Sequence, residues 1–338
     1  MDVLPTVWFI AIAVLWIGFL LLEGFDFGVG MHLLVRARGE QERRLMLNTI
    51  GPVWDGNEVW LVVAGASMFA AFPNWYASWL SALYLALWLL LAALILRGVS
   101  FEFRGKFAAP AWRKTWGWTL TVGSVLAPLL IGVGLGDLLA GLPIDADGDF
   151  TGTFLDLLTP FGLVLGLTLV VLSLLHGSVF LTLRATGPVL ARAHGLVRTL
   201  CLPAVALVLI VVVWMVVLAA PGGWGILAAA IPAVAAVAAA VSGLSGRSAG
   251  ATFAATAVTI GGVIATLFVC LYPTLLVSTT DPAYSLTVAN SSSSQYSLQV
   301  MTIAAAVLVP LVLLYQGWTY YVFRRRVTAA PATTTVAA

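Results

Sequence analysis

The chain has 338 residues, of which 61% are hydrophobic and only 9% are charged. This composition lies outside the range of soluble globular domains and predicts a protein that crosses a membrane several times. The formal net charge of +2 is too small to suggest a nucleic-acid partner. Cys201 and Cys270 stand far apart in separate apolar runs, so neither a disulfide nor a metal site is expected.

A transmembrane helix needs about 20 mostly apolar residues. Taken along the chain, this rule predicts an all-α polytopic membrane protein with nine transmembrane helices, at residues 5–33, 50–72, 75–98, 116–140, 157–183, 198–219, 224–242, 251–277 and 299–323. The first apolar run has no basic segment before it and no cleavage site, so it is expected to be retained as a span.

The basic residues predict the orientation, because Lys and Arg in short loops stay on the cytoplasmic side. All 16 of them end or follow odd-numbered spans, from Arg36 after the first span to Arg326 after the ninth, with Arg247 alone after the seventh. The N-terminus is therefore expected outside and the C-terminus in the cytoplasm.

The connectors carry weaker signals. IDADGD, with Asp145, Asp147 and Asp149, is typical of an external turn, and residues 278–299 are expected to form either a solvated connector or a segment ordered against a partner. We predict one membrane domain over residues 1–326 and a disordered cytoplasmic tail over 327–338. Glycine pairs that predict close helix packing occur at Gly24/Gly28, Gly132/Gly136 and Gly162/Gly166.

Two pairs of carboxylates interrupt the first two spans. Glu23 and Asp26 lie in LLEGFDFGVGM, and Asp55 and Glu58 lie in GPVWDGNEVW. Residues three apart share a helix face, and both pairs are expected about 15 Å from the cytoplasmic basic residues. Arg97 in the third span can reach the same level and is the expected counter-charge.

Two interpretations of this group stay open. It forms a fixed polar lock between three helices, or it conducts protons or ions from the cytoplasm. Conduction is favoured for at least one residue, and Asp55 comes first because Gly56 and Asn57 follow it and leave room for water. His176 is the deepest histidine, and a lone buried histidine is more often structural than a haem ligand.

At these residues the sequence resembles a known family, subunit II of the cytochrome bd-type quinol oxidases of prokaryotic respiratory chains. The matching stretches run from the first span to the last and include EGFDFGVGM (23–31), RRLMLNTIGPVWDGNEVWL (43–61), AGASMFAAFP (64–73), RGVSFEFRGK (97–106), PFGLVLG (160–166), SLTVANSSSSQYSLQVMT (285–302) and VPLVLLYQGWTY (309–320).

The resemblance implies two four-helix bundles, over about 1–145 and 155–278, and one peripheral helix over about 297–326. It implies a complex in a prokaryotic cytoplasmic membrane that oxidises quinol and reduces oxygen to water. The partner, subunit I, would carry two b-type haems and one d-type haem. Further implied features are a structural quinone in this subunit and small accessory subunits.

The resemblance also assigns roles to residues. It implies that Asp55 takes part in proton uptake, that Trp60 lies near an oxygen route, and that Arg97 is an arginine of the same polar zone. Glu23 departs from relatives that carry Asp there, which keeps the charge but changes the reach. We expect Glu58→Gln to do less harm than Asp55→Asn.

Two rival functions accompany this reading. A proton- or cation-coupled secondary transporter would also explain carboxylates inside a membrane, although the sequence has no clear inverted repeat. The second rival function is that of a purely structural scaffold for the haem subunit. Haems that purify with a second subunit favour the oxidase over the transporter.

Overall fold

The computed structural model describes residues 3–219, 223–246 and 248–328. Its helices are α1 (Val3–Val35), α2 (Glu40–Ile50), α3 (Trp54–Ala71), α4 (Pro73–Ala82), α5 (Tyr84–Phe103), α6 (Pro110–Ala140), α7 (Pro160–Arg184), α8 (Gly187–Ala219), α9 (Gly223–Ser245), α10 (Ala249–Leu271) and α11 (Gln295–Val322). Short elements are η1 (Phe154–Leu157), β1 (Thr274–Leu276), η2 (Pro282–Tyr284) and β2 (Leu286–Thr287). Arg247 and residues 329–338, most of the tail predicted to be disordered, lie outside the described residues.

Eight of the described helices are long and apolar enough to cross a membrane: α1, α5, α6, α7, α8, α9, α10 and α11. They confirm a helical protein with many spans. The helix at the second predicted span, α3, is 18 residues long and begins with the polar WDGNE segment, which lowers its mean hydropathy. The chain thus has a helix at every predicted span, although the ends of several differ.

Several predicted boundaries were wrong, and one helix was missed. The span expected at 198–219 begins at Gly187. The span expected at 75–98 is two helices, because the backbone breaks at Leu83 between α4 and α5. The span expected at 251–277 ends at Leu271, and β1 follows. Finally, α2 was missed: it is a separate helix rich in charged residues, and its four buried residues, Leu45, Met46, Thr49 and Ile50, pack inward.

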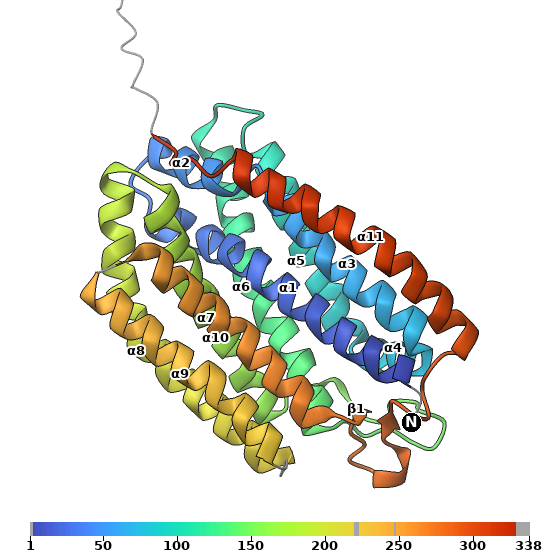
Figure 1. Cartoon of the computed structure of the whole chain (residues 1–338). Helices are drawn as coiled ribbons and strands as arrows, with labels where there is room; N and C mark the ends of the chain where they lie inside the picture. Colours follow the sequence, from blue (N-terminus) through green and yellow to red (C-terminus); the bar gives the residue numbers. More distant parts are fainter. Residues whose placement is uncertain (1–2, 220–222, 247, 329–338) are drawn as a thin grey trace, which may run out of the picture.

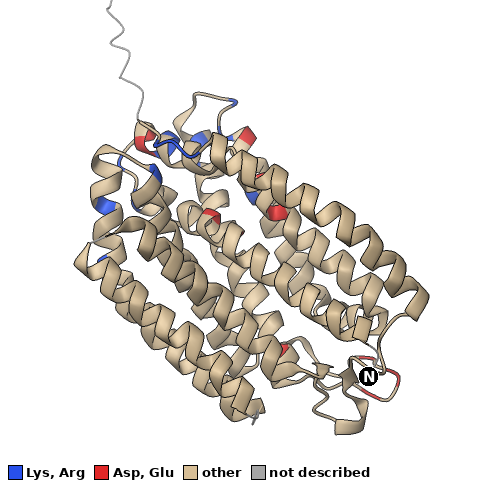
Figure 2. Cartoon of the chain, in the orientation of Figure 1, with Lys and Arg blue, Asp and Glu red and all other residues tan. Residues whose placement is uncertain are grey.

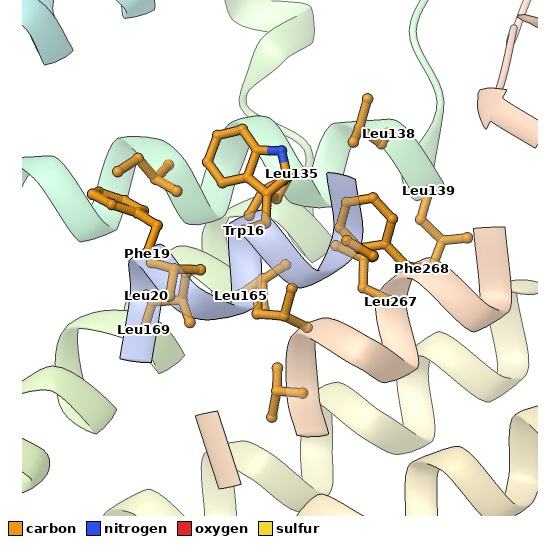
Figure 3. Close-up of a cluster of buried hydrophobic side chains, with 14 of the residues drawn as sticks. Trp16, Phe19, Leu20, Leu135, Leu138, Leu139, Leu165, Leu169, Leu267 and Phe268 are labelled. Atoms are coloured by element: carbon orange, nitrogen blue, oxygen red, sulfur yellow. The ribbon is translucent and has the colours of Figure 1, made fainter. Parts of the chain in front are cut away.

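The first helix, α1, lies at the centre of the molecule and packs against α3, α6, α7 and α10 (Figure 1). Its aromatic and aliphatic side chains meet those of three other helices in one apolar core (Figure 3). The members labelled there are Trp16, Phe19 and Leu20 of α1, Leu135, Leu138 and Leu139 of α6, Leu165 and Leu169 of α7, and Leu267 and Phe268 of α10.

The close approach of helices predicted from the glycines is confirmed. A Cβ atom at Gly28 of α1 would lie 2.0 Å from the carbonyl oxygen of Ser173 in α7. Cβ atoms at Gly132 and Gly136 of α6 would each lie 2.5 Å from the Cα atom of a glycine of α7. These crossings bring the backbones of α1 and α6 against α7, so the two halves of the chain are joined by van der Waals contact.

In contrast, α11 lies along the outside of the molecule beside α1 and α3 (Figure 1). Leu298 is its only fully buried residue among those described. Ser293, just before it, donates hydrogen bonds to the carbonyl oxygens of Ala70 and Ala71. At the other end, the backbone N–H of Val327 donates to the carbonyl oxygen of Arg184 at 2.7 Å.

The connector between α10 and α11 is ordered against the chain itself. It forms the two-stranded antiparallel sheet of β1 and β2, and the backbone N–H of Leu142 donates to the carbonyl oxygen of Val277. Ser278 is buried and donates to Ile144 at 2.9 Å. The solvated connector expected from its composition is found in part: residues 279–283 are exposed, whereas buried Ser and Thr side chains bond turns and loop backbone.

Charge is distributed unevenly between the two ends of the molecule (Figure 2). The described Lys and Arg residues gather at the end that carries α2, whereas the acidic turn of residues 145–149 lies at the other. In α2, Glu40 pairs with Arg104 at 2.6 Å, and Glu42 pairs with Arg192. Partial burial alone would raise the pKa of Glu40, but the hydrogen bonds and positive charge of Arg104 outweigh it and lower that pKa.

Candidate functional site

A fully buried ion pair joins α5 to α1. Arg97 follows the apolar run of α5, and its Nη1 atom lies 2.6 Å from Oε1 of Glu23. Both side chains have no exposed surface. The guanidinium also lies over the ring of Phe27, 4.8 Å from its centroid, and its Nε donates to the hydroxyl of Ser124 at 3.3 Å. Arg97 is therefore the counter-charge that the sequence predicted.

The second carboxylate pair leads from this ion pair to the surface. Oε2 of Glu58 lies 3.7 Å from Nη1 of Arg97, and the Glu58 side chain keeps 22% of its surface exposed. Asp55, in the first turn of α3, is exposed on the surface of the chain. Asp55 is therefore outside the buried cluster, but it precedes Glu58 by three residues on α3, so the two carboxyl groups lie on one face of the helix.

Asp26 forms the inner end of the cluster. It is fully buried, follows Glu23 by three residues on α1, and its Oδ2 accepts from Nδ2 of Asn57 at 2.7 Å. Residues three apart share a helix face, and two buried carboxyl groups on one face hold a proton between them more readily than two negative charges. One arginine also faces the three carboxyl groups of Glu23, Asp26 and Glu58, and unpaired buried charges are costly, which favours retention of that proton.

Two site residues were missed by the sequence reading, and both come from α11. Nε2 of Gln316 donates to Oδ1 of Asn57 at 3.1 Å, and the hydroxyl of Tyr320 donates to the same oxygen at 2.8 Å. Nε1 of Trp60 donates to Oε1 of Gln316 at 2.8 Å. The sequence held a signal for them: polar side chains four residues apart on an apolar helix share one face.

A further buried carboxyl group was also missed. Asp137 of α6 has no exposed surface and accepts a hydrogen bond from the hydroxyl of Thr159 at 2.7 Å. Thr159 in turn accepts from the backbone N–H of Gly162 and caps α7. Asp137 lies in the last turn of α6, 13 residues beyond Ser124, the residue of α6 that contacts Arg97; this is about 20 Å along the helix. Asp137 is therefore a separate feature from the cluster around Arg97.

Two histidines are buried between helices. His176 is fully buried, its Nδ1 lies 2.7 Å from the hydroxyl of Thr256, and its ring stacks on Phe253. Nε2 of His32 lies 2.8 Å from the hydroxyl of Ser178. Each ring thus has a hydroxyl partner on a neighbouring helix, and the described residues hold no group of three His, Cys, Asp or Glu side chains suited to a metal ion.

Taken together, the carboxyl groups form a file that starts on the surface and ends in the interior. Asp55 is exposed, Glu58 is partly exposed, and Glu23 and Asp26 are enclosed. Such a file can pass protons because neighbouring groups accept and release them without covalent change. The fold and the site define a helical multi-pass membrane protein with a buried acidic cluster.

Comparison with known proteins identifies the family. The model of the family "Cytochrome bd terminal oxidase subunit II" matches residues 4–323, and the chain belongs to that family. It is 41% identical over 334 residues to cytochrome bd ubiquinol oxidase subunit 2 of Bacillus subtilis (strain 168), covering 97% of this chain and 98% of the relative. It is 35% identical over 363 residues to cytochrome bd-I ubiquinol oxidase subunit 2 of Escherichia coli (strain K12), covering 97% and 96%.

A solved structure shares the fold. The bd oxidase from Geobacillus thermodenitrificans matches with a TM-score of 0.75 and 18% sequence identity, over 95% of this chain and 99% of that chain. The family resemblance read from the sequence motifs is confirmed.

Proposed function

We propose that this chain is the second subunit of a membrane-bound quinol oxidase that reduces oxygen to water, and that its own part is to bring protons to the reaction. Family membership over almost the whole chain supports the first statement, because the relatives are named as subunits of ubiquinol oxidases. It also favours the oxidase over the transporter alternative.

The proposed topology has nine spans: the eight long apolar helices and α3. The N-terminus is outside, and the basic end that carries α2 is cytoplasmic. The concentration of described Lys and Arg residues at that end supports this orientation. Residues 1–145 and 155–278 would form the two four-helix bundles, and residues 297–326 the peripheral helix; the exposed position of α11 supports its separation from both.

The proposed partner is a haem-bearing subunit I in the cytoplasmic membrane of a prokaryote. Its two b-type haems and one d-type haem would supply electron transfer and oxygen chemistry when bound. The hydroxyl-bonded histidines of this chain support that division of labour. A structural quinone and small accessory subunits stay predictions of the resemblance.

The proton route begins at Asp55 and passes Glu58 to Glu23 and Asp26. The observation that carries it is the graded burial of these carboxyl groups around one arginine. At each step a proton leaves one carboxyl oxygen and joins the next, and the carboxylate left behind is reprotonated from the cytoplasmic side. Arg97 keeps its proton and stabilises whichever carboxylate is ionised. Trp60, packed against Gly18, is the residue we propose beside an oxygen route.

The test is oxygen consumption by the purified two-subunit complex, measured per d-type haem. Asp55→Asn keeps the size of the side chain but cannot accept a proton, so most of the turnover should be lost. Glu58→Gln should cost less, because Asp55 still collects the proton at the entrance and water can carry it past the partly exposed position 58. Asp147→Asn, in the exposed turn at the opposite end, is the matched control and should behave as the parent.

Normal turnover of a fully assembled Asp55→Asn complex would support the scaffold alternative instead. Equal losses in Asp55→Asn and Glu58→Gln would contradict the proposed ranking.

A further inference from the structure

The contacts of α11 are concentrated on a single amide. Apart from Leu298, the helix buries none of its described residues completely, yet Gln316 and Tyr320 both reach Asn57, which is fully buried. The Tyr320 ring also meets Phe25 of α1 edge to face. A peripheral helix that only filled space would not need two donors on one oxygen atom.

The hydrogen bonds of Asn57 fix the orientation of its amide group. Oδ1 accepts from Gln316 and from Tyr320, and an oxygen with two lone pairs is then saturated. Trp60 in turn donates to Oε1 of Gln316, which turns the Gln316 amide nitrogen toward Asn57. A flipped Asn57 amide would place its N–H groups against two donors. Nδ2 is thereby directed toward α1, where it donates to Asp26 and to the backbone carbonyl oxygen of Leu22 at 3.3 Å.

This direction decides which oxygen of Asp26 can carry a proton. Oδ2 accepts from Nδ2 of Asn57 at 2.7 Å, so a proton on Oδ2 would clash with the amide hydrogen. Among the described residues no N–H or O–H group donates to Oδ1 of Asp26 or to Oε2 of Glu23. Oδ1 is therefore the oxygen of Asp26 that stays free to take a proton.

We propose that Gln316 and Tyr320 are positioning residues of the proton route: by fixing the orientation of the Asn57 amide, they keep the transferable proton of Asp26 on Oδ1, facing Glu23. The inference rests on the proposed function. In the step itself, the O–H bond of Glu23 breaks and an O–H bond to Oδ1 of Asp26 forms. Glu23 then pairs as a carboxylate with Arg97, so charge and protons balance.

The experiment removes both donors and keeps the shapes of the side chains. The double variant Gln316→Met/Tyr320→Phe is compared with Gln299→Met/Tyr315→Phe, which makes the same changes at exposed positions of the same helix. Turnover per d-type haem is measured in each purified complex. The test variant should lose about tenfold or more, and Tyr320→Phe alone about threefold to fivefold, since Gln316 still holds Asn57. The control should match the parent.

A second readout separates positioning from mere support of the fold. In infrared difference spectra, the carbonyl band of protonated Asp26 is identified by its loss in Asp26→Asn. With Asn57 held, this carbonyl accepts an N–H bond; in the double variant the band should move to higher frequency and broaden. If the double variant does not assemble, the same measurements on Tyr320→Phe decide, because the ring contact with Phe25 is kept.

The possible outcomes are distinct. Parent-like turnover and an unmoved band in the double variant, with turnover lost in Asp26→Asn, would overturn this inference and leave the proposed function standing. Fewer assembled complexes with unchanged turnover per complex would also overturn it, because α11 would then only dock. Parent-like turnover in Asp26→Asn would overturn the proposed function, and this inference with it.

Discussion

The two halves of the chain bury different kinds of polar side chain between their helices. Helices α7–α10 contain no Asp or Glu. Their buried polar side chains are hydroxyls and a histidine, which bond to one another or to a helix carbonyl group, as in the contact between His176 and Thr256. Helices α1, α3 and α5 instead enclose Glu23, Asp26 and Arg97.

The contrast shows that the fold does not require buried charge. Hydroxyl groups join α7 and α10, and glycine contacts join α1 and α7. Replacing a buried ion pair by apolar residues of similar volume is often neutral or stabilising. The carboxyl groups of the first half are therefore better explained by chemistry than by helix packing.

The largest effect on stability is expected from breaking the ion pair on one side. Arg97→Met leaves the carboxyl groups of Glu23, Asp26 and Glu58 without their counter-charge, and loss of one partner of a buried pair costs about 3–5 kcal/mol. Thermal unfolding of the purified complex should show this loss of stability as a lower unfolding temperature. Arg97→Met/Glu23→Gln should recover part of the loss; a single variant as stable as the parent would show that the pair does not hold these helices.

A smaller effect is expected where the two halves touch. A methyl group at Gly28 would meet backbone atoms of α7, whereas one at Gly24 would have its nearest neighbour at 3.7 Å. Gly28→Ala should therefore destabilise the complex by about 1–3 kcal/mol, and Gly24→Ala by much less. The same unfolding assay compares them, and equal costs would contradict the described crossing of α1 and α7.

The smallest effect on stability is expected at the basic end that carries α2. Because Arg104 lowers the pKa of Glu40 below its ordinary value of 4.5, the ion pair stabilises the folded chain above that pH and loses this effect as the pH falls through the lowered pKa. At neutral pH, Glu40→Gln should cost about 1 kcal/mol or less. Its difference from the parent in the unfolding assay should vanish in acid; a difference that grows in acid would be inconsistent with this pairing.

Much of the fold could be predicted because length and apolarity are local properties of a span. The break at Leu83 carries no proline or glycine to mark it, and α2 has the charged composition of a loop. In the site, the spacing of Glu23 and Asp26 correctly indicated one buried face. The exposed position of Asp55 depends on where α3 begins. The contacts of Gln316 and Tyr320 depend on which helix α11 packs against. Both are decided by tertiary packing, which a single span of sequence does not reveal.

The most direct test compares one polar group from each half. Oxygen consumption per d-type haem is measured for assembled complexes that carry Asp26→Asn in α1 or Thr256→Val in α10, two nearly isosteric changes at buried positions. The account predicts a loss of tenfold or more, about 1.4 kcal/mol or more in the barrier, for Asp26→Asn and parent-like turnover for Thr256→Val. Parent-like turnover in both, or equal losses in both, would contradict the claim that the buried carboxyl groups of the first half carry protons.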